Sequence, residues 1–141
     1  MAIEQIRHLV EDVGVPAIEE VGLRDGCDLD LLLFFSRHPH VILSSEQLAA
    51  YVGYDLQQIA RSLDLLVGAG LLRRSLNQAT AGRMYVLEID RSEHWLEPLQ
   101  RVCATPDGRN ALRAELRRRR SQVRTANGDA SNHHARGGRP A

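Results

Sequence analysis

Residues 44–90 read SSEQLAAYVGYDLQQIARSLDLLVGAGLLRRSLNQATAGRMYVLEID, and the order of caps, apolar spacings and turn residues in this stretch decides the fold. Ser44 and Gln47 have the spacing of a capping box, in which each side chain accepts the backbone N–H of the other residue. Gly53 suits the left-handed backbone conformation that ends many helices. The sequence therefore predicts a short helix that opens at Ser44 and ends at Gly53.

A second helix is predicted directly after a tight turn. Asp55 is a typical N-terminal cap, and Gly70 is the expected terminating residue. Between them the apolar residues recur at helical spacing and form one buried stripe, which consists of Leu56, Ile59, Ala60, Leu63, Leu66 and Val67. Two capped helices with so short a connection form a helix-turn-helix.

Two strands are predicted beyond the second helix. Leu71 and Leu72 begin the first strand, and two arginines follow them. Residues 84–89, MYVLEI, are rich in side chains that favour strands. Residues 77–82 between the strands are polar and predict a turn.

Three segments, SSEQLAAYVG, DLQQIARSLDLLVGAGLLRR and RMYVLEI, together resemble the winged helix-turn-helix domain of bacterial transcriptional regulators. The resemblance implies a mainly α fold with a small β-sheet (α+β), to which residues 41–43 add a very short third strand. It also implies a homodimeric regulator of transcription that binds double-stranded DNA.

Further helices are predicted before the helix-turn-helix. The first has its apolar face within residues 3–13 and ends at Gly14 and Pro16; it is either a surface helix laid on the core or a dimer contact. The next opens at Asp28 or just before it, and Pro39 stops it.

Two more helices are predicted after the strands. The first occupies residues 91–104, with either a start near Glu97 or a kink at Pro98. Thr105 caps the second, and residues 125–141 have no apolar periodicity and are predicted to be disordered. The chain thus divides into an acidic helical extension (1–26), a winged helix-turn-helix domain (27–90), C-terminal helices with a basic run (91–124) and a disordered tail (125–141).

Charge is distributed unevenly along the chain, although 18 basic and 18 acidic residues balance formally. Residues 1–30 contain two arginines and eight acids, a net charge of −6, whereas residues 105–124 contain seven arginines and two acids, a net charge of +5. The unbroken arginines of residues 117–120 either contact DNA or form a solvated helix end. This uneven distribution of charge along the chain, rather than the net charge of zero, is the quantity that indicates the kind of binding partner.

The second helix of a helix-turn-helix enters the major groove with its outward residues at the base edges. Glutamine pairs with adenine and arginine with guanine through two hydrogen bonds each. A helix N-terminus with hydroxyl groups can hold a phosphate, and arginines on the wing would lie near the DNA backbone or the minor groove. The predicted DNA-binding residues are Gln57, Gln58, Arg61 and Ser62 on the second helix, Ser44 and Ser45 at the start of the first, and Arg73, Arg74 and Arg83 on the wing.

A different class of function, a winged-helix protein–protein interaction module without DNA binding, also fits the sequence. Asp55 and Asp64 place negative charge on the predicted reading helix, and only Arg61 there is basic. Phosphate neutralisation supplies most non-specific DNA affinity, so this face offers little of it. The acidic N-terminus and the aspartates of the reading helix favour a protein partner, whereas the arginines on both wing strands and the basic C-terminal helix favour DNA.

No enzyme, cofactor or metal motif is present in the sequence. Cys27, His94 and Cys103 are too scattered to predict a metal site. The two cysteines are expected to be small apolar side chains, buried or half-buried, in a reducing cytoplasm. No signal peptide or membrane span is visible. We therefore expect a cytoplasmic protein that has no catalytic residues and no cofactor.

Overall fold

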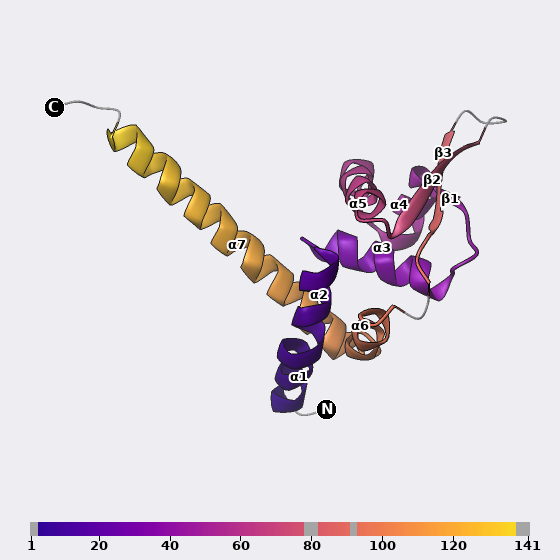
Figure 1. The fold of residues 1–141 in the computed structure, drawn as a ribbon, viewed down its shortest axis with the longest axis horizontal. Helices are drawn as coiled ribbons and strands as arrows, with labels where there is room; N and C mark the ends of the chain where they lie inside the picture. Colours follow the sequence, from indigo (N-terminus) through magenta and orange to yellow (C-terminus); the bar gives the residue numbers. More distant parts are fainter. Residues whose placement is uncertain (1–2, 78–81, 91–92, 138–141) are drawn as a thin grey trace.

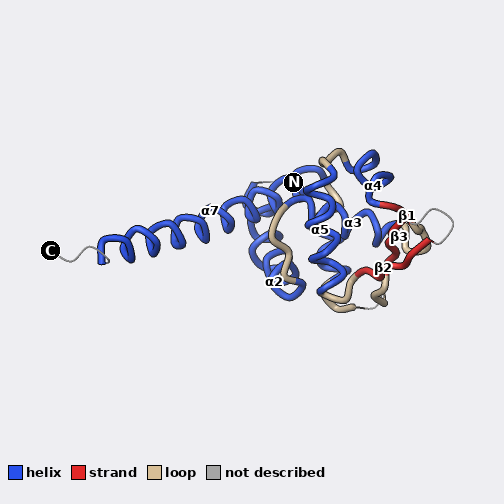
Figure 2. The backbone as a smooth tube through the Cα atoms, turned by 90° about the horizontal axis from the view of Figure 1, so that it is seen from above, coloured by secondary structure: helices blue, strands red, loops and turns tan. Residues whose placement is uncertain are grey.

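The computed structural model describes residues 3–77, 82–90 and 93–137, with side chains described as far as Gln122, apart from those of residues 76 and 77. A helical body is joined to a small sheet, and one long helix projects away from the body on the side opposite the sheet (Figures 1 and 2). The elements are α1 (Ile3–Leu9), the π-helical segment η1 (Val10–Gly14), α2 (Val15–Val21), α3 (Gly26–Arg37), β1 (Leu43–Ser44), α4 (Ser45–Val52), α5 (Leu56–Gly68), β2 (Leu72–Asn77), β3 (Gly82–Leu87), α6 (Leu96–Val102) and α7 (Pro106–Gly137).

The helix-turn-helix forms as its caps predict. Ser44 and Gln47 form the reciprocal capping box of α4, and Gly53 ends that helix with a φ of +81°. The Asp55 carboxylate accepts the Gln58 backbone N–H at the start of α5. Gly70, with a φ of +80°, turns the chain out of α5. The structure confirms these predictions. The sequence could predict them because helix caps depend on residues that are close together in the chain.

The sheet is antiparallel with the strand order β1-β3-β2. This order, a short strand before the helix-turn-helix and a two-stranded wing after it, is that of a winged helix. The third strand is displaced from its predicted place at residues 41–43, because β1 consists of Leu43 and Ser44, which pair with Tyr85 and Met84. The predicted turn at residues 77–82 lies mostly outside the described residues.

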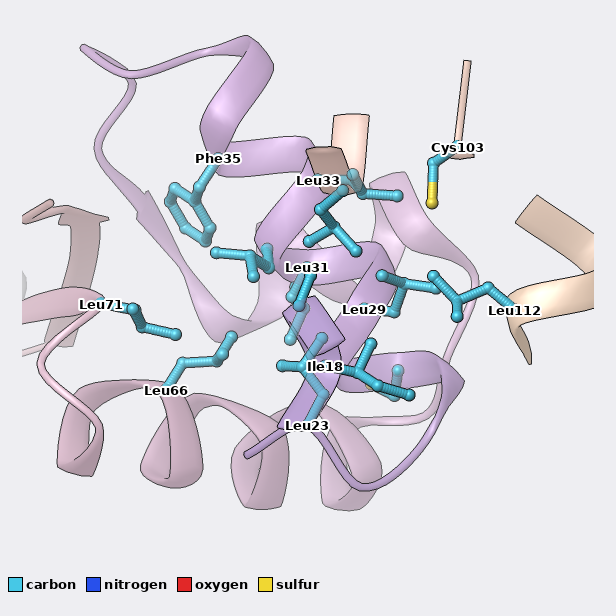
Figure 3. Close-up of a cluster of buried hydrophobic side chains, with 14 of the residues drawn as sticks. Ile18, Leu23, Leu29, Leu31, Leu33, Phe35, Leu66, Leu71, Cys103 and Leu112 are labelled. Carbon is cyan, nitrogen blue, oxygen red and sulfur yellow. The ribbon is translucent and has the colours of Figure 1, made fainter. Parts of the chain in front are cut away.

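Helix α3 is the centre of the core. Leu29, Leu31, Leu32 and Phe35 are completely buried, although they lie on different sides of the helix. Figure 3 shows side chains from before and after α3 in sequence meeting around it. Buried residues on several sides of one helix require other elements to cover those sides, and the winged helix and its two flanking regions accordingly share one core.

The N-terminal helix is longer than predicted. Gly14 and Pro16 do not end it, because the chain continues through η1 into α2 and ends at Gly22, whose φ is +84°. Pro16 lies in the first turn of α2, where a missing backbone N–H is tolerated. The prediction of a helix end at these residues is therefore wrong.

The prediction that α3 opens at Asp28 or just before it is confirmed. Asp25 is its cap and forms a reciprocal capping box with Asp28, so the helix opens just before Asp28. It ends at Arg37, ahead of Pro39, as predicted.

Two alternatives are predicted for α6, a start near Glu97 or a kink at Pro98, and the structure agrees with the start near Glu97. The helix opens at Leu96, next to the predicted Glu97, with Pro98 in its first turn. Residues 91 and 92 lie outside the described residues. Thr105 caps α7 by accepting the Gly108 backbone N–H at 3.1 Å.

Helix α7 continues to Gly137, where the sequence predicts a disordered tail from residue 125. An α-helix satisfies its own backbone hydrogen bonds, so it can extend without an apolar face to bury. The predicted tail beyond residue 137 lies outside the described residues.

Candidate nucleic-acid interface

Helix α5 presents a narrow polar face to solvent. Ile59, Leu63 and Leu66 are completely buried against the core and fix the rotation of the helix. Gln57 and Arg61, one helical turn apart, are exposed on the opposite side. Neither side chain forms a hydrogen bond or an ion pair within the part of the chain that the structure describes.

Ser62 does not belong to this exposed face. Its side chain is 3% exposed and hydrogen-bonds with the carboxyl group of Asp28 on α3. The prediction that Ser62 faces outward is wrong, because a residue three positions after Ile59 lies on the same side of a helix as Ile59. Burial raises the pKa of Asp28, and the hydrogen bonds from Ser62 and from the Arg24 backbone N–H oppose that rise.

Gln58 is half-buried at the edge of a hollow beside α5. Arg61 also lines this hollow, together with Arg24 from the connection between α2 and α3 and Arg120 from α7. Three carboxylates, those of Asp25, Asp28 and Asp64, stand among these arginines. The hollow therefore has mixed charge and is not a strongly cationic surface.

The serines at the start of α4 are already engaged. The Ser44 hydroxyl accepts the Gln47 backbone N–H at 3.2 Å, which is its capping role. The Ser45 hydroxyl donates to the Glu46 carboxylate at 3.3 Å. Both serines are half-buried, and a phosphate at this helix end would have to share them with these partners.

Two of the three wing arginines have acidic partners. Arg73 lies 3.6 Å from the carboxylate of Glu88, and Arg74 lies 3.6 Å from that of Asp64 on α5. Arg83 is exposed and has no ion pair among the described residues. The Arg74 pair joins the wing to α5, so the structure brings these two predicted parts of the interface together.

The basic run on α7 is largely paired with carboxylates. Arg118 binds Glu115, and Arg119 binds both Glu115 and Glu19, the latter at 2.8 Å. Arg120 lies 3.9 Å from Asp25. Arg117 is exposed and has no ion pair within the described ranges. The acidic N-terminal region and the basic C-terminal helix thus neutralise each other within the molecule.

A polar network that the sequence does not predict joins the helix-turn-helix to α7. The Tyr54 hydroxyl, in the turn between α4 and α5, donates to Asp30 at 2.6 Å, and Arg113 of α7 donates to the same carboxylate at 2.6 Å. Burial, followed by the hydrogen bond to Asp30, raises the pKa of Tyr54. The partners are 24 and 83 residues apart, so no local spacing indicates them.

Both cysteines are free and buried, as predicted. Burial raises the pKa of each thiol to about 11. Among residues 3–77, 82–90 and 93–137, no three histidine, cysteine or acidic side chains are grouped to hold a metal ion. No helix in the same ranges combines the length and the apolar character needed to cross a bilayer.

No protein-family model matches the sequence, and no curated protein does. Among solved structures, a possible transcriptional regulator from Methanosarcina mazei Go1 is 24% identical, with a TM-score of 0.47, over 77% of this chain and 87% of that one. A structure of MarR is 23% identical, with a TM-score of 0.42, over 92% of this chain and 95% of that one. At these identities the likeness concerns the fold.

Proposed function

We propose that this chain is a transcriptional regulator that binds duplex DNA, with α5 in the major groove and the β2–β3 wing against the backbone. The observation that carries the proposal is the free polar face of α5. Gln57 and Arg61 are exposed and unpartnered among the described residues, on a helix whose rotation is fixed by buried leucines. Rigid presentation of such side chains is what direct base readout requires.

The chemistry of the two side chains fits base recognition. Gln57 can pair with the adenine edge and Arg61 with the guanine edge, each through two hydrogen bonds. Each such contact discriminates against a wrong base by about 1–3 kcal/mol. Gln58, which is half-buried, would contribute from the edge of the same face.

Phosphate contacts would come from the wing and from the start of α4. Arg83 is available directly, whereas Arg73 and Arg74 would exchange Glu88 and Asp64 for phosphates. Exposed ion pairs contribute about 0–1 kcal/mol each, so this exchange costs little. The α4 N-terminus with Ser44 and Ser45 would hold a further phosphate.

A homodimer is part of this proposal. Helix-turn-helix proteins commonly bind as dimers to half-sites about 34–36 Å apart. Helices α1 and α7 lie against each other beside the winged helix, and Ile3 of α1 is 77% exposed. Light scattering at increasing protein concentration should report twice the chain mass; a monomer at every concentration would contradict this part of the proposal.

The deciding experiment is a salt titration of binding to random-sequence duplex, followed by fluorescence anisotropy. We expect binding near 50 mM salt that weakens steeply as salt rises, because phosphate contacts release counterions. Absence of binding at that salt concentration would refute DNA recognition.

Variants then separate base contacts from phosphate contacts, once a preferred site has been selected from random duplexes. Gln57→Ala and Arg61→Ala should reduce sequence preference, whereas Arg73→Ala, Arg74→Ala and Arg83→Ala should weaken binding to every sequence and lower the salt slope. Arg101→Ala, a change of an exposed arginine on α6, is the matched control. Equal losses on all sequences for all five variants would contradict direct readout.

A second candidate, a protein-interaction module, is favoured by one specific observation. Large apolar side chains are exposed at the helix-turn-helix: Leu56, which the sequence wrongly predicts to be part of the buried stripe, is 50% exposed, and Tyr51 is 70% exposed. Exposed apolar residues mark a protein contact where they form one patch. If this candidate is correct, Leu56→Ser should abolish partner capture, while Arg61→Ala and Arg83→Ala leave it intact.

A further inference from the structure

A second hollow lies where the ends of α3 and α4 meet the first turns of α7, and it has a volume of about 240 Å³. Three arginines line it, Arg37 from α3 and Arg109 and Arg113 from α7. Phe34 and Tyr51 form an aromatic wall, with their ring centroids 5.6 Å apart. Cationic and aromatic groups thus surround a space that the DNA proposal does not use.

The hollow carries an excess of positive charge. Asp30 is its only lining carboxylate, and both oxygens are taken, one by Arg113 and the other by the Tyr54 hydroxyl. Arg37 and Arg109 have no ion pair among the described residues. Clefts lined by charge of one sign concentrate the opposite ion, so these two free guanidinium groups favour an anion.

The arginines also have unused hydrogen-bonding capacity. The Nε atoms of Arg109 and Arg113 are buried and have no hydrogen-bond partner. Buried donors without a partner are few in native proteins and call for an explanation. Rotation of these planar groups onto an anion would give each donor an acceptor.

We propose that this hollow binds a small phosphate monoester. A monoester carries a charge of about −1.5 to −2 near neutral pH and has three strong acceptor oxygens, which match two free guanidinium groups and a third that is shared with Asp30. Arginine binds phosphate through two parallel hydrogen bonds. The apolar part of the ligand lies on the wall of Phe34 and Tyr51.

The size and position of the hollow favour a free small molecule over the DNA backbone. Its volume is below the roughly 300–1,000 Å³ of pockets for drug-sized ligands. It lies at the C-terminal end of α4, marked by Tyr51 and Val52, whereas Ser44 and Ser45 are at the other end of that helix.

The hollow is linked to the helix-turn-helix through Asp30. A phosphate that engages Arg113 competes with the Asp30 carboxylate, which also holds Tyr54 in the turn before α5. Ligand binding would therefore change the restraint on α5. This regulatory consequence rests on the proposed function, whereas the binding site does not.

The test is isothermal titration calorimetry of the full chain with phenyl phosphate in a phosphate-free buffer at pH 7.5. We expect saturable binding that Arg37→Gln and Arg109→Gln each weaken by about tenfold or more, because each removes a charge-assisted contact. Arg101→Gln, which removes a guanidinium paired with Glu97 on the surface of α6, should bind as the unmodified chain does. Arg37 is exposed, so its variant is expected to keep the fold, which circular dichroism checks.

Several results would overturn the proposal. These are absence of phenyl phosphate binding at millimolar concentration, unchanged affinity in both arginine variants, or benzoate binding as tightly as phenyl phosphate. If duplex DNA displaces phenyl phosphate and Arg37→Gln lowers duplex affinity as much as Arg83→Ala does, the arginines serve the DNA backbone and the proposal fails. Phenyl phosphate binding by a chain that binds no duplex would support this site while refuting the proposed function.

Discussion

Helices α5 and α7 both pack against α3, and both carry arginine, but they are attached in different ways. Helix α5 is held by completely buried apolar side chains, among them Leu63 and Leu66. The first turns of α7 are also held by apolar contacts, ending at Leu116, which is 1% exposed. Beyond Leu116 the described contacts of α7 with the body are the ion pairs of Arg119 and Arg120.

Charges counted in a sequence are therefore not all available to a partner. Helix α7 has the most arginines, yet Glu19, Asp25 and Glu115 neutralise most of its basic run. Helix α5 has a single arginine, Arg61, and it is free among the described residues. Helix α5 therefore has a free arginine for the DNA contact proposed above, whereas most arginines of the α7 basic run join the two ends of the chain.

The largest effect should come from the apolar attachment of α5. Leu63→Ala leaves a cavity in the shared core and should lower the free energy of unfolding by about 2–5 kcal/mol. Leu65→Ala, on the same helix but half-buried, should cost clearly less. Urea unfolding measures both. Equal losses would mean that burial of the stripe is not what holds α5.

The next effect should come from the network that joins α7 to the helix-turn-helix. Asp30→Asn weakens the contacts with both Arg113 and Tyr54 and should lower the free energy of unfolding by about 1.5–3 kcal/mol, the range for hydrogen bonds to charged groups. Tyr54→Phe removes one of the two bonds and should cost less. A larger loss for Tyr54→Phe would show that Asp30 is not the centre of the network.

The sequence predicts contacts between residues that are close together in the chain, and it does not predict contacts between residues that are far apart. The caps at Ser44, Asp55 and Thr105 were predicted because a cap is a contact within four residues. The pairing of Asp30 with Arg113 was not, because it depends on how α3 and α7 meet after folding.

In the candidate interface, too, the sequence predicts the exposure of side chains along one helix but not their contacts with other elements. The exposure of Gln57 and Arg61 follows from the apolar stripe of α5. The stripe alone did not reveal that Ser62 bonds with Asp28, since a serine is compatible with either side of a helix. Nor did it reveal that Arg74 reaches Asp64, because that contact needs the strand to return beside the helix.

A smaller effect, dependent on pH, is expected at Glu115. Hydrogen bonds from Arg118, and then from Arg119, lower its pKa despite its partial burial. A carboxylate with a lowered pKa stabilises the fold above its unfolded pKa, near 4.5, and loses that contribution as the pH falls through its folded pKa.

Comparison of the unmodified chain with Glu115→Gln in urea isolates this contribution. The difference in the free energy of unfolding should be about 1 kcal/mol at pH 7 and should shrink once the pH falls below about 4.5. A difference that grows on acidification would have the wrong sign and would contradict the assignment of Glu115 as the stabilised carboxylate.

The smallest effect is expected at the outer ion pair of α7. Glu19→Gln should lower the free energy of unfolding by less than about 1 kcal/mol, because the Glu19 side chain is 58% exposed. The difference should vanish in 1 M salt, where charges are screened within about 3 Å. Glu4→Gln on α1 is the control. An effect that persists in 1 M salt would mean that Glu19 acts through packing.

The π-helical segment η1 sets the angular phase between α1 and α2. The Val15 backbone N–H bonds to the Val10 carbonyl, five residues back rather than four, so this turn contains one extra residue. Deletion of one residue from η1 would restore a continuous α-helix and rotate α1 by about 100° relative to α2. The side of α1 that now lies along α7 would then point elsewhere. The helical segment formed by α1, η1 and α2 should therefore tolerate substitutions far better than insertions or deletions.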